Sequence, residues 1–191
     1  MKKIINNEII FTVILILSIS IALAFSYKFD KNLYIDEPSI LETVDIKTIE
    51  QNNNEIDTIE IKYDWQIAIP KLDNLIAPIR EGSDTITLSK YVGHIEGTAL
   101  QNGNIALAGH NNTRNYQSGN FYFDKLDELD IGDKVYYTYY NTTYSFKVRE
   151  IKEVNEKELS VLEESEASQL TLVTCIQGKY RYRLIVICDL I

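Results

Sequence analysis

The fold is decided by the stretch KVYYTYYNTTYSFKV, residues 134–148. Aromatic and β-branched side chains, the types that favour strands, make up most of residues 134–140 and 143–148. Asn141 and Thr142 lie between these two runs and suit a tight turn. Two such runs joined by two residues predict a β-hairpin, so we expect a mainly β domain.

Short apolar runs continue this pattern on both sides of the hairpin. We predict further strands at residues 66–70, 76–79, 104–109, 170–174 and 182–187. Helical signals are brief and cover only residues 124–129 and 156–162. Many short strands with brief helices predict a closed or nearly closed β-barrel, which we place within residues 63–191.

The N-terminus has the pattern of a membrane anchor. Lys2 and Lys3 precede an almost wholly apolar run over residues 9–25. As a helix this run would measure about 25 Å, close to the roughly 30 Å of a bilayer core. The positive-inside rule would keep the lysines cytoplasmic, so we expect residues 1–27 to form a single-pass signal anchor at the cell membrane. The alternative is a signal peptide cleaved after the small residues near Ala24, which leaves the domain outside the cytoplasm as well.

Residues 28–62 form an acidic segment between the anchor and the domain. Between Asp36 and Ile61, acidic side chains greatly outnumber the single Lys47. Like charges extend a chain, so we expect a solvated extracytoplasmic linker here. The alternative is a short amphipathic helix that docks on the domain through residues such as Leu41 and Ile49.

Composition excludes several classes of function. The formal net charge of -9 argues against nucleic acid binding, which needs clustered Lys and Arg. The chain holds only two cysteines, Cys175 and Cys188, too few for a disulfide scaffold or a multi-cysteine zinc site. A cysteine in an exported protein is then a candidate nucleophile.

Three side chains lie at the ends of predicted strands. His110 follows the strand at 104–109, Cys175 follows the strand at 170–174, and Arg183 opens the last strand. A strand end holds a side chain rigidly while leaving it open to substrate. A cysteine nucleophile acts as its thiolate, which nearby positive charge stabilises, so His110 and Arg183 would assist Cys175 if the fold brings them close.

Each of these residues has a simpler interpretation. Cys175 could be a small buried hydrophobe, and Arg183 a solvated strand residue. His94, in a Gly-flanked segment, competes with His110 for the catalytic role. Cys188 lies an odd number of positions from Arg183 and should face the opposite side of the strand. We therefore interpret Cys188 as core packing or a spare thiol; a disulfide between it and Cys175 would abolish the activity.

The chain resembles the sortase family over about residues 64–191. The segment at 103–111 (GNIALAGHN) is similar to the one that ends in the family's catalytic histidine. Residues 171–175 (TLVTC) resemble its TLxTC signature, and residues 183–186 (RLIV) resemble the Arg-led strand that follows. The segments at 67–79, 92–99 and 123–135 are also similar.

This resemblance implies an eight-stranded sortase barrel and a cysteine transpeptidase. Cys175 would attack the Thr–Gly bond of an LPxTG-like sorting signal to give a thioacyl-enzyme, and His110 would serve as acid and base. Arg183 would donate hydrogen bonds to the substrate or oxyanion, with Arg181 in reserve, and Thr174 would line the site through its hydroxyl or backbone. The loop at about 152–168 would form the substrate-recognition wall.

The resemblance also implies partners and a subtype. The partners would be surface proteins that carry the sorting signal and a cell-wall amine that accepts the acyl group, in a Gram-positive-type envelope. The single anchor and the absence of an Asp-Pro-aromatic lid favour class A or its D and E relatives. Glu96 is the main acid in the loop where some class A members bind calcium, so we predict no metal and no cofactor.

Two other functions remain open at this stage. A membrane-tethered cysteine peptidase would use the same Cys-His chemistry and transfer the acyl group to water. A non-catalytic envelope protein would present the β-barrel as a binding module on a tether. The peptidase would lack acyl transfer to an added amine, and the binding module would keep its function after Cys175→Ala.

Overall fold

The computed structural model describes residues 40–50, 56–111 and 120–191. The predicted membrane anchor at 1–27 and the first part of the predicted linker lie outside these residues. Within the described ranges, no helix is long and apolar enough to cross a bilayer. The predicted anchor therefore stays a prediction.

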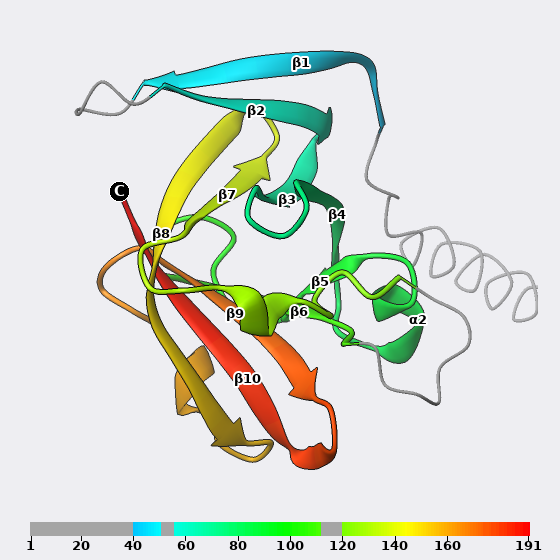
Figure 1. Cartoon of the computed structure of the whole chain (residues 1–191), viewed down its shortest axis with the longest axis vertical. Helices are drawn as coiled ribbons and strands as arrows, with labels where there is room; N and C mark the ends of the chain where they lie inside the picture. Colours follow the sequence, from blue (N-terminus) through cyan, green and yellow to red (C-terminus); the bar gives the residue numbers. More distant parts are fainter. Residues whose placement is uncertain (1–39, 51–55, 112–119) are drawn as a thin grey trace, which may run out of the picture. The chain divides into compact units, whose positions relative to one another are not determined.

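Eight strands close into a barrel in the order β10-β8-β7-β3-β4-β5-β6-β9 (Figure 1). The bounds are β3 Trp65–Ile69, β4 Leu75–Glu81, β5 Val92–His94, β6 Asn104–Gly109, β7 Lys134–Tyr139, β8 Thr142–Asn155, β9 Gln169–Ile176 and β10 Lys179–Leu190. The neighbours β4 and β5, and also β6 and β9, run parallel, and the other pairs are antiparallel. The predicted eight-stranded barrel is confirmed.

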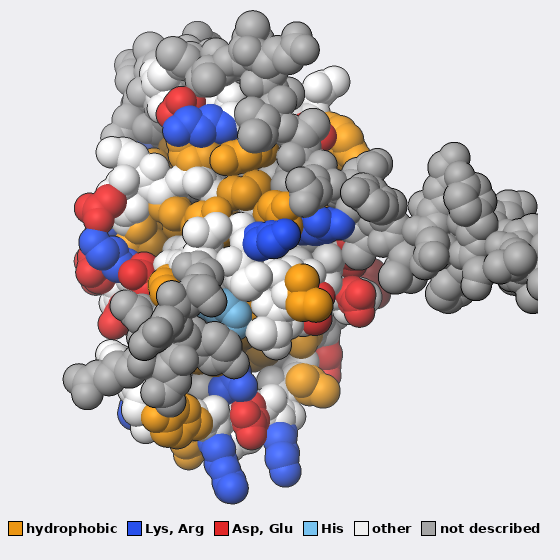
Figure 2. All heavy atoms as spheres, turned by 90° about the vertical axis from the view of Figure 1, so that its right-hand side faces the viewer, with side chains coloured by type: hydrophobic (Ala, Val, Ile, Leu, Met, Phe, Trp, Pro, Cys, Tyr) orange, Lys and Arg blue, Asp and Glu red, His pale blue; other side chains and the backbone are white. Residues whose placement is uncertain are grey.

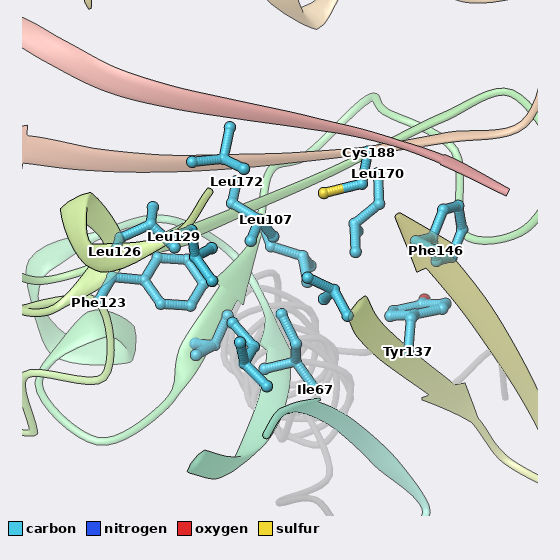
Figure 3. Packing of buried hydrophobic residues seen from close by; sticks show 14 of the residues in the cluster. Ile67, Leu107, Phe123, Leu126, Leu129, Tyr137, Phe146, Leu170, Leu172 and Cys188 are labelled. Atoms are coloured by element: carbon cyan, nitrogen blue, oxygen red, sulfur yellow. The ribbon is translucent and has the colours of Figure 1, made fainter. Parts of the chain in front are cut away.

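Alternation along the strands fills the barrel with apolar side chains. Ile67, Leu107, Leu172 and Val186 each come from a different strand and are at most 1% exposed within one core cluster. Leu107 and Leu172 are register partners on the parallel strands β6 and β9, so their side chains share the inner face. Figure 3 shows Ile67, Leu107 and Leu172 in this core together with the aromatic rings of Phe123, Tyr137 and Phe146. The inner face of β9 is thereby fixed, and the residues between its core positions must face outward.

The acidic segment before the barrel differs from its predicted form. Strands β1 (Ile40–Glu50) and β2 (Ile56–Tyr63) pair antiparallel as a two-stranded sheet, rather than forming a solvated linker or an amphipathic helix. Ile59 and Ile61 are buried with Ala68 and Tyr136 of the barrel. Because these residues alternate with polar neighbours, one face of β2 is apolar and buried. The favourable free energy of this burial outweighs the repulsion between the acidic side chains.

Several shorter predictions also change. The predicted helices at 124–129 and 156–162 shrink to single 3₁₀ turns, η1 (Leu126–Glu128) and η2 (Ser160–Leu162). A four-residue helix, α2 (Thr85–Leu88), was not predicted; it is capped by Asp84, whose side chain accepts hydrogen bonds from the amides of its first turn. Strand β8 continues to Asn155, so the predicted wall at 152–168 begins at residue 156.

Candidate active site

The strand register brings the three predicted catalytic residues to one end of three adjacent strands. The last pair between β6 and β9 is Gly109 with Thr174, so His110 and Cys175 are the next positions on these neighbouring chains. Cys175 is itself the register partner of Arg183 on β10. Directly opposed residues of antiparallel strands have Cα atoms about 4.5–5.5 Å apart, so Cys175 is adjacent to Arg183. Because β9 pairs with β6 on its other side, Cys175 lies between His110 and Arg183.

Cys175 lies on the outer face of the barrel. Leu170 and Leu172 of β9 face the core, whereas Val173 packs in a separate cluster with Ile185 outside it. Because side chains alternate along a strand, Cys175 shares the outer face with Val173. Cys175 is partly exposed and carries a free thiol. A thiol in this position is accessible to a substrate lying over the sheet.

Close packing fixes the backbone beside His110. A Cβ atom at Gly109 would approach ring carbons of Phe123 to 2.6 Å, so only glycine fits at that position. The Phe123 amide donates a hydrogen bond to the His110 carbonyl at 3.2 Å. The end of β6 is thus held against Phe123, which limits where His110 can lie.

Partial burial changes the acid–base behaviour of His110. Desolvation by burial lowers the pKa of its imidazole below the usual 6.5. The neutral form therefore predominates at neutral pH and can accept a proton. A histidine with a pKa in this region can exchange protons in either direction during a reaction.

The Arg183 guanidinium is held by the first residues of β10 and by the start of the loop after β8. Its Nη1 donates to the carbonyl oxygens of Tyr180 and Tyr182, each at 2.9 Å. Its Nη2 donates to Glu156 Oε2 at 3.1 Å. These bonds use three of the five guanidinium N–H groups, so the Nε–H and one Nη2–H remain as donors.

The two predicted substrate-binding residues lie in different environments. Thr174 is 2% exposed, and its hydroxyl donates to the Gly109 carbonyl at 2.8 Å. That hydroxyl ties β9 to β6 at the end where His110 and Cys175 lie. Arg181 is exposed, and its carbonyl oxygen accepts a hydrogen bond from the Glu156 amide at 2.8 Å.

His94 lies in the barrel interior and not beside Cys175. It is 2% exposed and pairs in register with the core residue Leu107. Its Nδ1 lies 2.7 Å from Glu81 Oε2, and its Nε2 lies 3.0 Å from the Ala99 carbonyl oxygen. With both ring nitrogens engaged, His94 joins β4, β5 and the loop after β5.

Cys188 is buried in the core as an unpaired thiol, on the face opposite Arg183 as predicted. Figure 3 shows its sulfur among the apolar side chains near Leu170 and Phe146. Burial raises the pKa of this thiol to about 12, so it stays protonated at neutral pH. The two cysteines form no disulfide with each other.

The loop between β8 and β9, residues 156–168, lies over the outer face next to Cys175. Val161 and Leu162 pack on a small apolar cluster with Val173 and Ile185, which are register partners on β9 and β10. Val173 is two positions from Cys175, and Ile185 is two positions from Arg183. The loop therefore forms a wall beside the three catalytic candidates.

Two residues of this region were missed from the sequence. Glu156 pairs with Arg183, and Asn104 donates hydrogen bonds to the carbonyls of Val161 and Glu163. Neither could be identified, because each contact joins residues that are far apart in the chain. Asn104 lies in the segment that resembles the sortase motif, but its position there gave no indication of its partners.

Charges around the described surface are mixed. Figure 2 shows Lys and Arg side chains interspersed with Asp and Glu on the face that it displays. Lys179, near Arg183, pairs with Glu153 at 2.6 Å. Among the residues that the structure describes, no group of three or more His, Cys, Asp or Glu side chains is placed to hold a metal ion.

Comparison with known proteins identifies relatives of this arrangement. Residues 67–191 match the family model described as "Sortase domain". Sortase A of Streptococcus agalactiae is 32% identical over 127 residues, which cover 65% of this chain and 51% of that protein. Sortase D of Bacillus subtilis is 30% identical over 117 residues, covering 60% of this chain and 54% of that protein. The chain thus spans about half the length of these relatives.

Solved structures agree with the sequence comparison. A sortase D5 transpeptidase of Clostridium perfringens superposes with a TM-score of 0.59 and 32% identity, over 66% of this chain and 78% of that one. Sortase A of Listeria monocytogenes gives the same TM-score at 26% identity, over 66% of this chain and 86% of that one. The range matched by the family model, residues 67–191, contains the three catalytic candidates.

Proposed function

Because the chain belongs to the sortase family, we propose that it is a cysteine transpeptidase whose reacting residues are Cys175, His110 and Arg183. The observation that carries this proposal is the register of β6, β9 and β10. In this register, the partly exposed thiol of Cys175 has His110 at the end of one neighbouring strand and Arg183 on the other. The buried pair His94 and Cys188 offers no such arrangement.

In the proposed first half-reaction, the Cys175 thiolate attacks the carbonyl carbon between Thr and Gly of an LPxTG-like sorting signal. The thiol proton of Cys175 passes to the neutral His110 imidazole as the thiolate forms. The C–S bond then forms, the C–N bond breaks, and His110 gives this proton to the departing glycine amine. The remaining N–H donors of Arg183 would stabilise the oxyanion that develops on the carbonyl oxygen. The product is a thioacyl-enzyme.

In the second half-reaction, an amine of the cell wall or its precursor attacks the thioester. The new C–N bond forms, the C–S bond breaks to regenerate the thiolate, and His110 takes up the proton of the amine. The lowered pKa of His110 supports this step, because a predominantly neutral imidazole is ready to accept a proton. Arg181 and the backbone of Thr174 are the proposed contacts to the substrate.

The proposed setting is the outer face of the cell membrane. Lys2, Lys3 and the apolar run at 9–25 support a single-pass anchor with a cytoplasmic N-terminus. An enzyme held there would meet exported proteins that carry the sorting signal and the acceptor amine of a Gram-positive-type wall. Its outcome would be covalent anchoring of surface proteins.

The experiment is to incubate the full-length chain in detergent micelles with a quenched LPxTG-type peptide, with and without an added amine. We expect an amine-linked product that disappears in Cys175→Ala. Release of the free acid alone, whatever the amine concentration, would favour a cysteine peptidase. No turnover across a panel of sorting peptides would count against the proposed activity.

A further inference from the structure

A buried asparagine connects the wall of the site to the two strands that carry His110 and Cys175. Asn104 opens β6 and is 1% exposed. Its Nδ2 donates to the carbonyl oxygens of Val161 at 3.0 Å and Glu163 at 2.9 Å. Both carbonyls belong to the loop at 156–168, so one side chain ties the middle of this loop to the barrel.

A third hydrogen bond fixes the orientation of the Asn104 amide. The Thr171 hydroxyl of β9 donates to Asn104 Oδ1 at 2.7 Å. Carbonyl oxygens only accept, so the NH₂ group must face the loop and the amide oxygen must face Thr171. Both amide hydrogens and one acceptor site are thus used, which makes the arrangement costly to replace.

The bonds of Asn104 join the loop where its apolar residues meet the sheet. Val161 packs on Ile185 and Ile187, and its own carbonyl is one of the two acceptors. The loop is also held at its start by Glu156, which pairs with Arg183. With the loop held at its start and in its middle, its distance from Val173 and Cys175 is fixed.

We propose that Asn104 is a positioning residue that holds the loop at 156–168 in its substrate-binding conformation through the two amide hydrogen bonds to Val161 and Glu163. This inference rests on the proposed transpeptidase function. Asn104 does not touch the reacting atoms. Its effect is on how well a sorting peptide is bound and oriented over Cys175.

The main test variant is Asn104→Asp in the full-length chain. Aspartate has nearly the same shape, but its carboxylate oxygens cannot donate hydrogen bonds to the carbonyl oxygens of Val161 and Glu163. Both loop bonds are therefore lost. We expect the KM for the sorting peptide to rise about tenfold or more, with a smaller change in kcat. Iodoacetamide is small and does not bind through the wall. The rate at which it alkylates Cys175 should therefore stay within about twofold of the wild-type rate.

Hydrogen exchange supplies a measurement that does not depend on turnover. In Asn104→Asp, amides of the loop at 156–168 should exchange faster, while those of β7 and β8 should not change. If the wild type turns over no sorting peptide, the proposed function fails. The exchange experiment still tests whether the bonds from Asn104 hold the loop at 156–168. Faster exchange throughout β6 and β9, with unchanged KM and a loss of active enzyme, would instead assign Asn104 a purely structural role.

Two further variants complete the test. Asn104→Ser, which keeps one small donor, is the alternative if the aspartate variant does not fold, and it should loosen the loop to a lesser extent. Thr171→Val removes the bond that orients the amide but leaves both loop bonds possible, so its KM effect should be the smaller one. Unchanged KM and unchanged loop exchange in folded Asn104→Asp or Asn104→Ser would overturn the proposal.

Discussion

The barrel interior and the outer end of β6, β9 and β10 each contain one of the chain's two histidines and one of its two cysteines. In the interior, His94 is hydrogen-bonded through both ring nitrogens, and Cys188 is a buried thiol whose pKa rises to about 12. At the outer end, Cys175 is partly exposed, and His110 has a lowered pKa because of partial burial.

This difference shows that position within a strand, more than residue type, decides which thiol and which imidazole are accessible from outside the barrel. Cys188 faces inward on β10, where desolvation keeps the thiol protonated. Cys175 faces outward at the end of β9, opposite a cationic residue. The same comparison separates His94, which joins three segments inside the barrel, from His110, which follows a strand.

The comparison of the two cysteines predicts the largest effect. Cys175→Ala should lower transpeptidation by at least about a thousandfold, as removal of a covalent nucleophile does in enzymes of this chemistry. Cys188→Ala should keep most of the activity and lower the free energy of unfolding by on the order of 1 kcal/mol. Rates with a sorting peptide and an amine, together with denaturant unfolding, measure both. Equal loss of activity in folded Cys175→Ala and folded Cys188→Ala would contradict the assignment of Cys175 as the nucleophile.

The two histidines should separate chemistry from stability. His110→Ala should reduce kcat by about 10²–10⁴, the range for a general acid–base, while the protein stays folded. His94→Ala should mainly lower the free energy of unfolding, by about 1–3 kcal/mol, because it removes a buried side chain together with the hydrogen bonds of both ring nitrogens. Thermal unfolding and kcat measured on the same preparations provide the test. A large loss of kcat in a stable His94→Ala protein would contradict the assignment.

Much of this contrast was available in the sequence. The outward side of Cys175 and the inward side of Cys188 follow from alternation along β9 and β10, and their separation was predicted from the odd spacing to Arg183. The barrel followed from the aromatic hairpin at 134–148 and the short runs around it. The choice of His110 over His94 needed the family motif, because the two glycine-flanked segments look alike.

Other features could not be predicted, for physical reasons. The β1–β2 sheet was missed because the excess of acidic over basic residues in this segment was interpreted as the mark of a solvated linker, although the alternation of Ile59 and Ile61 with polar neighbours was visible. The three residues of β5 are too few for a periodic signal. The contacts of Glu156 and Asn104 depend on how β8, β9 and β10 are paired, which local pattern does not determine.

The two arginines of β10 extend the comparison to the hydrogen-bond donors. Arg183→Ala should lower kcat/KM about a hundredfold, the usual cost of removing an oxyanion donor. Arg181→Ala should lower it by less than about threefold, because exposed arginines contribute little unless they meet the reacting atoms. Steady-state kinetics with the sorting peptide distinguishes them. Reversed magnitudes would transfer the role to Arg181.

The pH dependence of stability gives the smallest expected effect. The folded-state pKa of His110 lies below its unfolded value of about 6.5. Its contribution to stability is therefore fully present above about pH 6.5 and is lost as pH falls through the folded pKa. Wild type should lose more unfolding free energy than His110→Gln between about pH 8 and pH 5. His94 is common to both proteins and cancels. Parallel pH profiles would show that burial does not perturb His110.

The most direct test of the central claim is to identify which sulfur carries the acyl group. The full-length chain would be mixed with a sorting peptide without amine, quenched in acid, digested and analysed by mass spectrometry. We expect a thioester adduct on the peptide that contains Cys175, and this adduct should disappear when amine is added before quenching. An adduct on Cys188, or continued turnover with no cysteine adduct and full activity in Cys175→Ala, would contradict it.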